Sequence, residues 1–112
     1  MWDLKEVNEE EFYNKVQNFE KPVFIDFWAV WCAPCRMMEP LLNQVMNEYK
    51  DRIEFIKLNV DINKKIANEY NIQGVPSYMI IKGKEKLREI VGAASKKQLS
   101  DMIESVLKDL GE

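Results

Sequence analysis

Cys32 and Cys35 are the residues of this chain whose type and spacing could do chemistry. The 112 residues include no histidine, which excludes a Ser-His-Asp triad, a Cys-His thiol protease and imidazole metal ligands. Two thiolates alone do not complete a four-ligand structural zinc site. Any chemistry therefore depends on the two thiols, on carboxylates or on lysines, and we expect no bound metal.

The two thiols fall between a predicted buried strand, residues 23–28, and a predicted helix that begins near Pro34. Two cysteines three positions apart at a helix start can reach the Cα–Cα range of a disulfide, about 4.4–6.8 Å. Free backbone N–H groups at that end favour a thiolate on Cys32, whereas Cys35 lies one turn into the helix and should be shielded. This asymmetry predicts an exposed nucleophile, Cys32, and a resolving thiol, Cys35.

Two other interpretations of the pair are inert packing of small apolar residues and half of a metal site. The metal interpretation lacks further Cys or His ligands, and a strand-to-helix corner fits inert cysteines poorly. A Cys-x-x-Cys pair near a βαβ pattern is typical of a redox motif. We therefore carry the redox hypothesis forward.

Hydrophobic periodicity predicts the elements that position the pair. Helices are expected over residues 8–18, 34–49 and 95–110, with a kink at Pro40. A short helix capped by Asp61 or Asn63 is expected to run through Tyr70, with Ile62, Ile66 and Ala67 facing inward. Strands are expected over residues 23–28, 53–60, 77–82 and 86–91, and a further short one over residues 2–4. Alternating helices and strands predict an α/β fold in which helices cover a sheet, and the last two strands form a hairpin that makes the sheet mixed.

Asp26 is the second candidate for chemistry, because it lies within an otherwise apolar strand on the face of Phe24 and Trp28. Burial should raise the pKa of the Asp26 carboxyl. Asp26 could accept the proton of Cys35, with Lys57 adjusting its charge, or the two could form a structural carboxylate–lysine pair. The residues alone leave both interpretations open.

The chain resembles thioredoxins along almost its whole length, and Cys-x-x-Cys as a redox signature is itself best known from that family. The joint order and spacing of the matching motifs are highly specific. The motifs are Phe24-Ile25-Asp26-Phe27-Trp28-Ala29, Trp31-Cys32-Ala33-Pro34-Cys35, Lys57-Leu58-Asn59-Val60-Asp61, Gly74-Val75-Pro76-Ser77 and Val91-Gly92-Ala93.

The resemblance implies a thioredoxin fold, with a central mixed sheet flanked by helices on both faces. It implies reduction of protein disulfides, with no bound cofactor and with electrons from NADPH through thioredoxin reductase. In the implied cycle Cys32 attacks a substrate disulfide and Cys35 resolves the mixed disulfide. Asp26 and Lys57 stand at matching positions, which favours their catalytic role.

The resemblance also implies a cis Val75-Pro76 bond beside the dithiol. The expected substrate-binding residues are Trp31, Gly74, Val75, Pro76, Gly92 and Ala93. Between the cysteines, Ala33 replaces the glycine that is usual in the family, so Ala33 and Pro34 are expected to tune the redox potential. Ser77 replaces a more usual threonine, and Tyr78 replaces a typical aliphatic residue.

Three alternatives remain beside a reductase. Disulfide oxidases and isomerases commonly carry histidine before the second cysteine, where this chain has Pro34, and glutaredoxins usually carry Pro and Tyr between the cysteines. A binding module that uses the same surface as a subunit or chaperone is the third alternative.

Composition limits the remaining possibilities. The length predicts a single domain over residues 1–112, because domains cluster at about 100–150 residues, and the resemblance implies that it is a thioredoxin domain. A net charge of −3 without a basic cluster argues against nucleic acid as a partner. The acidic N-terminal segment and the short apolar runs predict no signal peptide and no membrane span. We expect a cytoplasmic monomer whose partners are thioredoxin reductase and disulfide-containing proteins.

Overall fold

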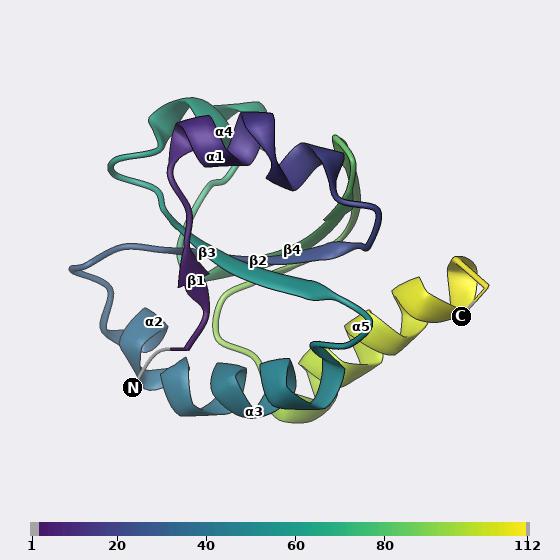
Figure 1. The fold of residues 1–112 in the computed structure, drawn as a ribbon. Coiled ribbons are helices and arrows are strands. Elements are labelled where there is room, and N and C mark those ends of the chain that lie inside the picture. The colour runs from purple at the N-terminus through teal and green to yellow at the C-terminus, as the bar shows by residue number, and fades with distance from the viewer. Residues whose placement is uncertain (1–2, 112) are drawn as a thin grey trace.

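A five-stranded mixed sheet forms the centre of the computed structural model, which describes residues 3–111 (Figure 1). The parallel part contains β1 (Lys5–Glu6), β3 (Glu54–Asn59) and β2 (Val23–Trp28), in that order across the sheet. β4 (Ser77–Lys82) pairs antiparallel with β2, and β5 (Glu85–Val91) pairs antiparallel with β4. The predicted mixed sheet and its closing hairpin are confirmed.

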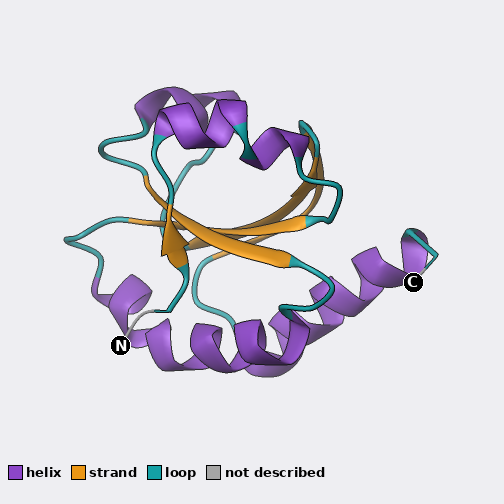
Figure 2. Cartoon of the chain, in the orientation of Figure 1, coloured by secondary structure: helices purple, strands orange, loops and turns teal. Residues whose placement is uncertain are grey.

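Helices cover both faces of this sheet (Figure 2). On one face lie α1 (Glu9–Asn14), the 3₁₀ turn η1 (Val16–Asn18) and α4 (Lys64–Glu69). On the other lie α2 (Ala33–Met37), α3 (Glu39–Tyr49) and α5 (Lys96–Asp109). The α/β fold with helices on both faces is thereby confirmed.

Each face of the sheet has its own apolar core, because β2 is buried on both sides. Phe12 of α1 and Ile66 of α4 pack with Ile25 on one face. On the other face, Leu42 of α3 and Leu99 of α5 belong to the core that contains Phe24. Alternate side chains of a strand point to opposite faces, so this one apolar strand anchors both layers.

The helix predicted over residues 34–49 is interrupted at Met38, where α2 ends and α3 follows. Pro40 explains the interruption, because its nitrogen carries no hydrogen to donate to the carbonyl of Arg36. The backbone N–H of Met38 instead bonds to the carbonyl of Pro34, and that of Leu42 to the carbonyl of Met38. The predicted kink is thus a break between two helices, which lets α2 take a direction of its own.

Two of the other helices start where the sequence predicts. Ser95 begins α5 with a capping box, and Asn8 caps α1 by accepting the Glu11 backbone N–H at 2.8 Å. The first helix is shorter than predicted, since α1 ends at Asn14 before η1. Asn63 precedes α4 without a side-chain cap, because its amide donates to the Asn59 carbonyl at 2.9 Å.

Two predicted placements are wrong. Ile62 was expected to face inward but is 72% exposed, because α4 begins only at Lys64 and Ile62 lies in the preceding turn. The short first strand is formed by Lys5 and Glu6 rather than by residues 2–4, of which Trp2 lies outside the described residues. None of the helices formed by residues 3–111 has the length and apolar character needed to cross a membrane.

Candidate active site

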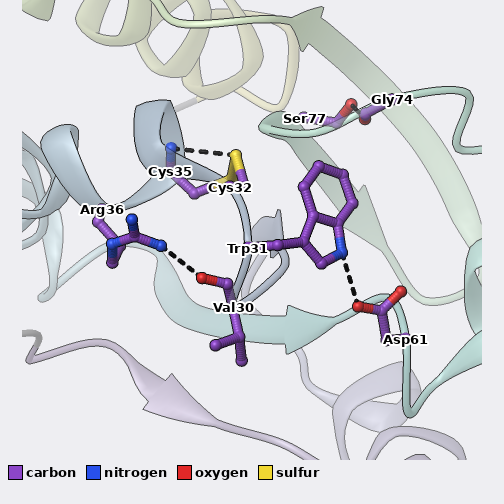
Figure 3. The surroundings of a disulfide bond; sticks show 8 residues. All are labelled: Val30, Trp31, Cys32, Cys35, Arg36, Asp61, Gly74 and Ser77. Carbon is purple, nitrogen blue, oxygen red and sulfur yellow. Dashed lines mark hydrogen bonds between the residues drawn. A yellow bond between two sulfur atoms is a disulfide. The ribbon is translucent and has the colours of Figure 1, made fainter.

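The turn between β2 and α2 brings the two cysteines together in a disulfide (Figure 3). Their Cα atoms are 5.3 Å apart, within the usual range for such bonds. Cys32 is the N-cap residue of α2, and its sulfur accepts the backbone N–H of Cys35 at 3.2 Å. Ala33 and Pro34 are the exposed first residues of α2 between them. The local sequence therefore places the Cys32 sulfur where a helix N-terminus offers a hydrogen bond to a thiolate.

Exposure does not distinguish the two cysteines as predicted. Cys32 is 3% exposed and Cys35 is 1% exposed, so the expected exposed Cys32 is wrong for this disulfide form. Both pack with Ala29 in a small apolar cluster against which Trp28 and Val75 rest. The difference between the thiols is instead one of backbone position, because only Cys32 caps the helix.

A shallow pocket of about 190 Å³ is lined by Trp31, the residue before Cys32, and by Val60 and Val75, which also pack against the cysteine cluster. Gly74 lines this pocket as well. The Trp31 side chain is 69% exposed, and its indole N–H donates to Asp61 Oδ2 at 2.9 Å (Figure 3). This bond holds an exposed apolar ring beside the cysteines.

The segment before β4 has the expected cis Val75-Pro76 bond. Its backbone is tied on both sides: the Ser77 hydroxyl donates to the Gly74 carbonyl at 2.6 Å, and the Gly92 N–H donates to the Pro76 carbonyl at 2.7 Å. Gly92 adopts a φ of +94°, a conformation that side-chain-bearing residues rarely take. Ala93 follows it and is exposed. The expected substrate-binding residues thus lie on three segments: Trp31 in the turn after β2, and the loops before β4 and after β5, which the Gly92–Pro76 hydrogen bond joins.

Arg36, on α2, is exposed and its guanidinium donates to the Val30 carbonyl (Figure 3). The contact joins the turn before the cysteines to the helix after them. Arg36 therefore supports the conformation of this turn in addition to being solvated.

Asp26 is 1% exposed and lies in register with Lys57 on β3 and with Tyr78 on β4. Within residues 3–111, neither of its carboxylate oxygens has a hydrogen-bond partner. Burial raises the pKa of Asp26 well above its ordinary value, the charge of Lys57 lowers it, and the charge of Glu6 raises it. The predicted buried carboxyl beside a lysine is confirmed in its placement.

Trp28 connects this carboxyl region to the cysteines. Its ring packs against the cysteine cluster, and the ammonium of Lys57 lies 5.1 Å from the ring centroid. Its indole N–H donates to Glu6 Oε1 at 2.9 Å. Trp28 is only partly buried, so it forms the wall between the site and β1 rather than part of a core.

Sequence reasoning missed Glu6 and the contact of Asp61 with Trp31. Glu6 received no role because the first strand was placed before it; a register that paired Glu6 with Lys57 was the missing signal. Asp61 belongs to a motif that resembles thioredoxins, but nothing in the sequence pattern pairs it with Trp31. Within the described part of the chain, no group of three or more acidic, cysteine or histidine residues could hold a metal ion.

Comparisons with known proteins agree with this geometry. A family model described as Thioredoxin matches residues 3–105. The chain is 40% identical to "Thioredoxin M-type, chloroplastic" of Chlamydomonas reinhardtii over 90% of its own length and 72% of the relative. It is 38% identical to "Thioredoxin 1" of Nostoc sp. and 37% identical to "Thioredoxin" of Synechocystis sp., in each case over 91% of this chain and 95% of the relative.

Proposed function

Because the chain belongs to the thioredoxin family and is a dithiol protein-disulfide reductase, we propose that Cys32 is its attacking thiol and Cys35 its resolving thiol. The observation that supports this order is the N-cap contact, in which the Cys32 sulfur accepts the Cys35 N–H at 3.2 Å. A hydrogen bond to sulfur stabilises the thiolate relative to the thiol. Cys35 has no such contact among the bonds of the described residues.

The proposed cycle moves two electrons from the protein to its substrate. The Cys32 thiolate attacks one sulfur of a substrate disulfide, and the other substrate sulfur leaves as a thiolate. Cys35 then loses its proton and attacks the Cys32 sulfur, which releases the second substrate thiolate and closes the Cys32–Cys35 disulfide. The substrate disulfide is reduced, and the dithiol is oxidised to the form described here.

Asp26 is proposed as the group that receives the Cys35 proton, directly or through water. Burial supports this role because it raises the pKa of Asp26 and so brings the carboxyl towards the range of a general base at neutral pH. Lys57, the register partner of Asp26, is proposed to adjust that pKa through its positive charge.

Protein substrates are proposed to bind along the pocket beside the disulfide. An exposed aromatic ring and backbone segments fixed by hydrogen bonds suit an extended peptide. Such a peptide can pair with backbone groups irrespective of its sequence. The residues proposed to contact substrate are Trp31, Gly74, Val75, Pro76, Gly92 and Ala93. Ala33 and Pro34 are proposed to tune the redox potential, because they form the first turn of the helix that Cys32 caps.

The oxidised protein is proposed to be recycled by thioredoxin reductase with NADPH, and so to carry electrons from NADPH to protein disulfides without a bound cofactor of its own. This is the route typical of the family. We further propose a monomer with a single domain, without nucleic-acid or membrane partners. We place it in the cytoplasm, where thiols are kept reduced; fractionation of the source cells tests that location.

Coupled reduction of insulin disulfides by NADPH and thioredoxin reductase tests the proposal. We expect turnover with the reductase and much less with glutathione as the sole reductant. The Cys35→Ser variant should accumulate a covalent mixed disulfide with the substrate, whereas Cys32→Ser should form none. Turnover through glutathione alone, or trapping by Cys32→Ser, would contradict the proposed route or the proposed order of the thiols.

A further inference from the structure

A row of four polar side chains crosses one face of the sheet. Glu6 on β1, Lys57 on β3, Asp26 on β2 and Tyr78 on β4 are successive register partners. Register partners on neighbouring strands point to the same face, so the ammonium of Lys57 stands between two carboxylates. Asp26 and Lys57 have proposed roles in the reaction, whereas Glu6, at the solvent end of the row, has no role in the proposed cycle.

The carboxylate of Glu6 is held in a defined position. Oε1 accepts the indole N–H of Trp28 at 2.9 Å, and Oε2 accepts the backbone N–H of Asn59 at 3.2 Å. Trp28 packs against the cysteine cluster, and the Lys57 ammonium lies 5.1 Å from its ring centroid. A charged acceptor makes such hydrogen bonds stronger than a neutral one. Glu6 thus joins β1 to the wall of the active site and faces Lys57 with a fixed negative charge.

We propose that Glu6 is a positioning residue of the redox site: its carboxylate orients Trp28, and its charge, acting with that of Lys57, sets how readily Asp26 ionises. The inference rests on the proposed role of Asp26 as proton acceptor. Glu6 touches neither cysteine in the contacts described, so it acts through Trp28, Lys57 and Asp26 rather than on the reacting sulfurs.

The charge of Glu6 acts on the ionisation of Asp26 in one direction. A second negative charge disfavours ionisation of Asp26, and Glu6 raises the pKa of Asp26 in this way. Lys57 lowers the pKa of Asp26 and also that of Glu6, so one cation serves both carboxylates. The titratable groups facing Asp26 are Lys57 from β3, Tyr78 from β4 and Glu6 from β1. Glu6 is solvent-exposed, so screening keeps its effect modest.

Three variants separate charge from shape. Glu6→Gln removes the charge but keeps an oxygen that can accept the Trp28 indole N–H. Glu6→Asp keeps the charge but shortens the reach to Trp28. Glu11→Gln is the matched control, since it removes an equal charge from nearby α1, where Glu11 pairs with Lys5 at 3.4 Å and not with the row.

The primary readout is the midpoint of the ¹³C carboxyl titration of Asp26, followed by NMR in the oxidised protein, the form described here, in which the disulfide-bonded cysteines do not titrate. We expect Glu6→Gln to lower the pKa of Asp26, equivalent to a change of about 1.5- to 5-fold in its ionisation constant. Glu6→Asp and Glu11→Gln should leave the pKa of Asp26 near the wild-type value. Tryptophan fluorescence and NMR spectra check that each variant is folded.

The possible outcomes are distinguishable. An unchanged midpoint in Glu6→Gln, or the same shift in Glu11→Gln, overturns the charge coupling. A shift in Glu6→Asp but not in Glu6→Gln shows a purely structural role and also overturns it. The proposed function fails separately: if Asp26→Ala reduces insulin as fast as wild type across neutral pH, Asp26 is not the proton acceptor, whatever the titration of Glu6→Gln shows.

Discussion

The carboxyl group of Asp26 and the hydroxyl group of Tyr78 belong to register partners on β2 and β4, and within residues 3–111 neither group has a hydrogen-bond partner. A buried polar group without a partner costs about 1–3 kcal/mol. A tyrosine phenol is protonated at neutral pH, and burial, followed by the charge of Asp26, raises the pKa of Tyr78 further. The fold bears this cost next to the residue proposed to move a proton.

Tyr78→Phe should therefore stabilise the protein. The ring, which stacks with Phe24 at 6.0 Å between centroids, stays in place while the unpartnered hydroxyl is removed. We expect the free energy of unfolding in urea at pH 7 to rise by about 1 kcal/mol.

Tyr70→Phe is the matched control for this change. Its hydroxyl accepts from Gln17 at 3.0 Å and donates to the Lys84 carbonyl at 3.1 Å, so its loss should lower the free energy of unfolding by about 1–2 kcal/mol. Equal destabilisation by both variants would mean that the Tyr78 hydroxyl is bonded in solution.

Asp26→Asn should stabilise the protein increasingly as the pH rises. In the unfolded chain Asp26 ionises near its ordinary pKa of about 3.9. Folding raises that pKa, so between the two values the folded protein holds the extra proton and loses stability with rising pH. Above the folded pKa the loss is complete, and we expect the variant to be more stable than wild type there, by an amount that no longer changes with pH.

Chemical denaturation from pH 4 to pH 9 measures this difference. Asp101→Asn serves as the control, because Asp101 is exposed and pairs with Lys97 at 2.7 Å. That variant should show no gain that grows with pH. A constant offset between Asp26→Asn and wild type over the whole range would exclude a raised pKa in the folded state.

Parts of the molecule that depend on local sequence were predictable. Strand β2 is apolar on both faces, and α5 has a continuous apolar stripe behind a capping box at Ser95, so their bounds followed from periodicity. The cysteine pair is equally local, because its geometry depends on the two residues between the cysteines in one helix turn. Pro40 marked the break between α2 and α3 through its missing N–H.

The parts that depend on register across strands were not predictable. β1 is two residues long, too short for a periodic signal, so nothing along the chain placed Glu6 beside Lys57. The burial of Cys32 likewise depends on Trp28 and Val75, which arrive from β2 and from the loop before β4. Such contacts arise only once the sheet is assembled.

Lys57→Met should shift the pKa of Asp26 in the opposite direction from Glu6→Gln. Methionine keeps an apolar stem beside the Trp28 ring but removes the charge that lowers the pKa of Asp26. The pKa of Asp26 should rise, and the rate of insulin reduction at pH 7 should fall by roughly three- to tenfold, with recovery at higher pH. The pH–rate profile with saturating reductase measures the change.

Lys57→Arg tests whether charge alone accounts for that effect. The guanidinium retains the positive charge, so the profile should return most of the way to wild type. A Lys57→Arg profile as displaced as that of Lys57→Met would assign the effect to packing against Trp28, and the proposed electrostatic role of Lys57 would be abandoned.

Gly92→Ala should weaken both the fold and substrate binding, because the backbone rather than space is limiting at this position. A Cβ on Gly92 would meet no atom within 4 Å, yet its φ of +94° is one that alanine rarely adopts. Holding it there costs about 1–3 kcal/mol, and relaxing it would pull the N–H away from the Pro76 carbonyl, 2.7 Å distant. Gly74→Ala is the control. A Cβ on Gly74 would also meet no atom within 4 Å, but the φ of Gly74 lies outside the left-handed region, so this variant should leave the free energy of unfolding unchanged or raise it by up to about 1 kcal/mol.

Because Gly74 and Gly92 both lie on loops proposed to bind substrate, urea unfolding should be combined with KM and kcat for insulin. We expect Gly92→Ala to raise KM more than it lowers kcat; equal stability of the two variants would show that the loop tolerates alanine and that this glycine is not required for its conformation.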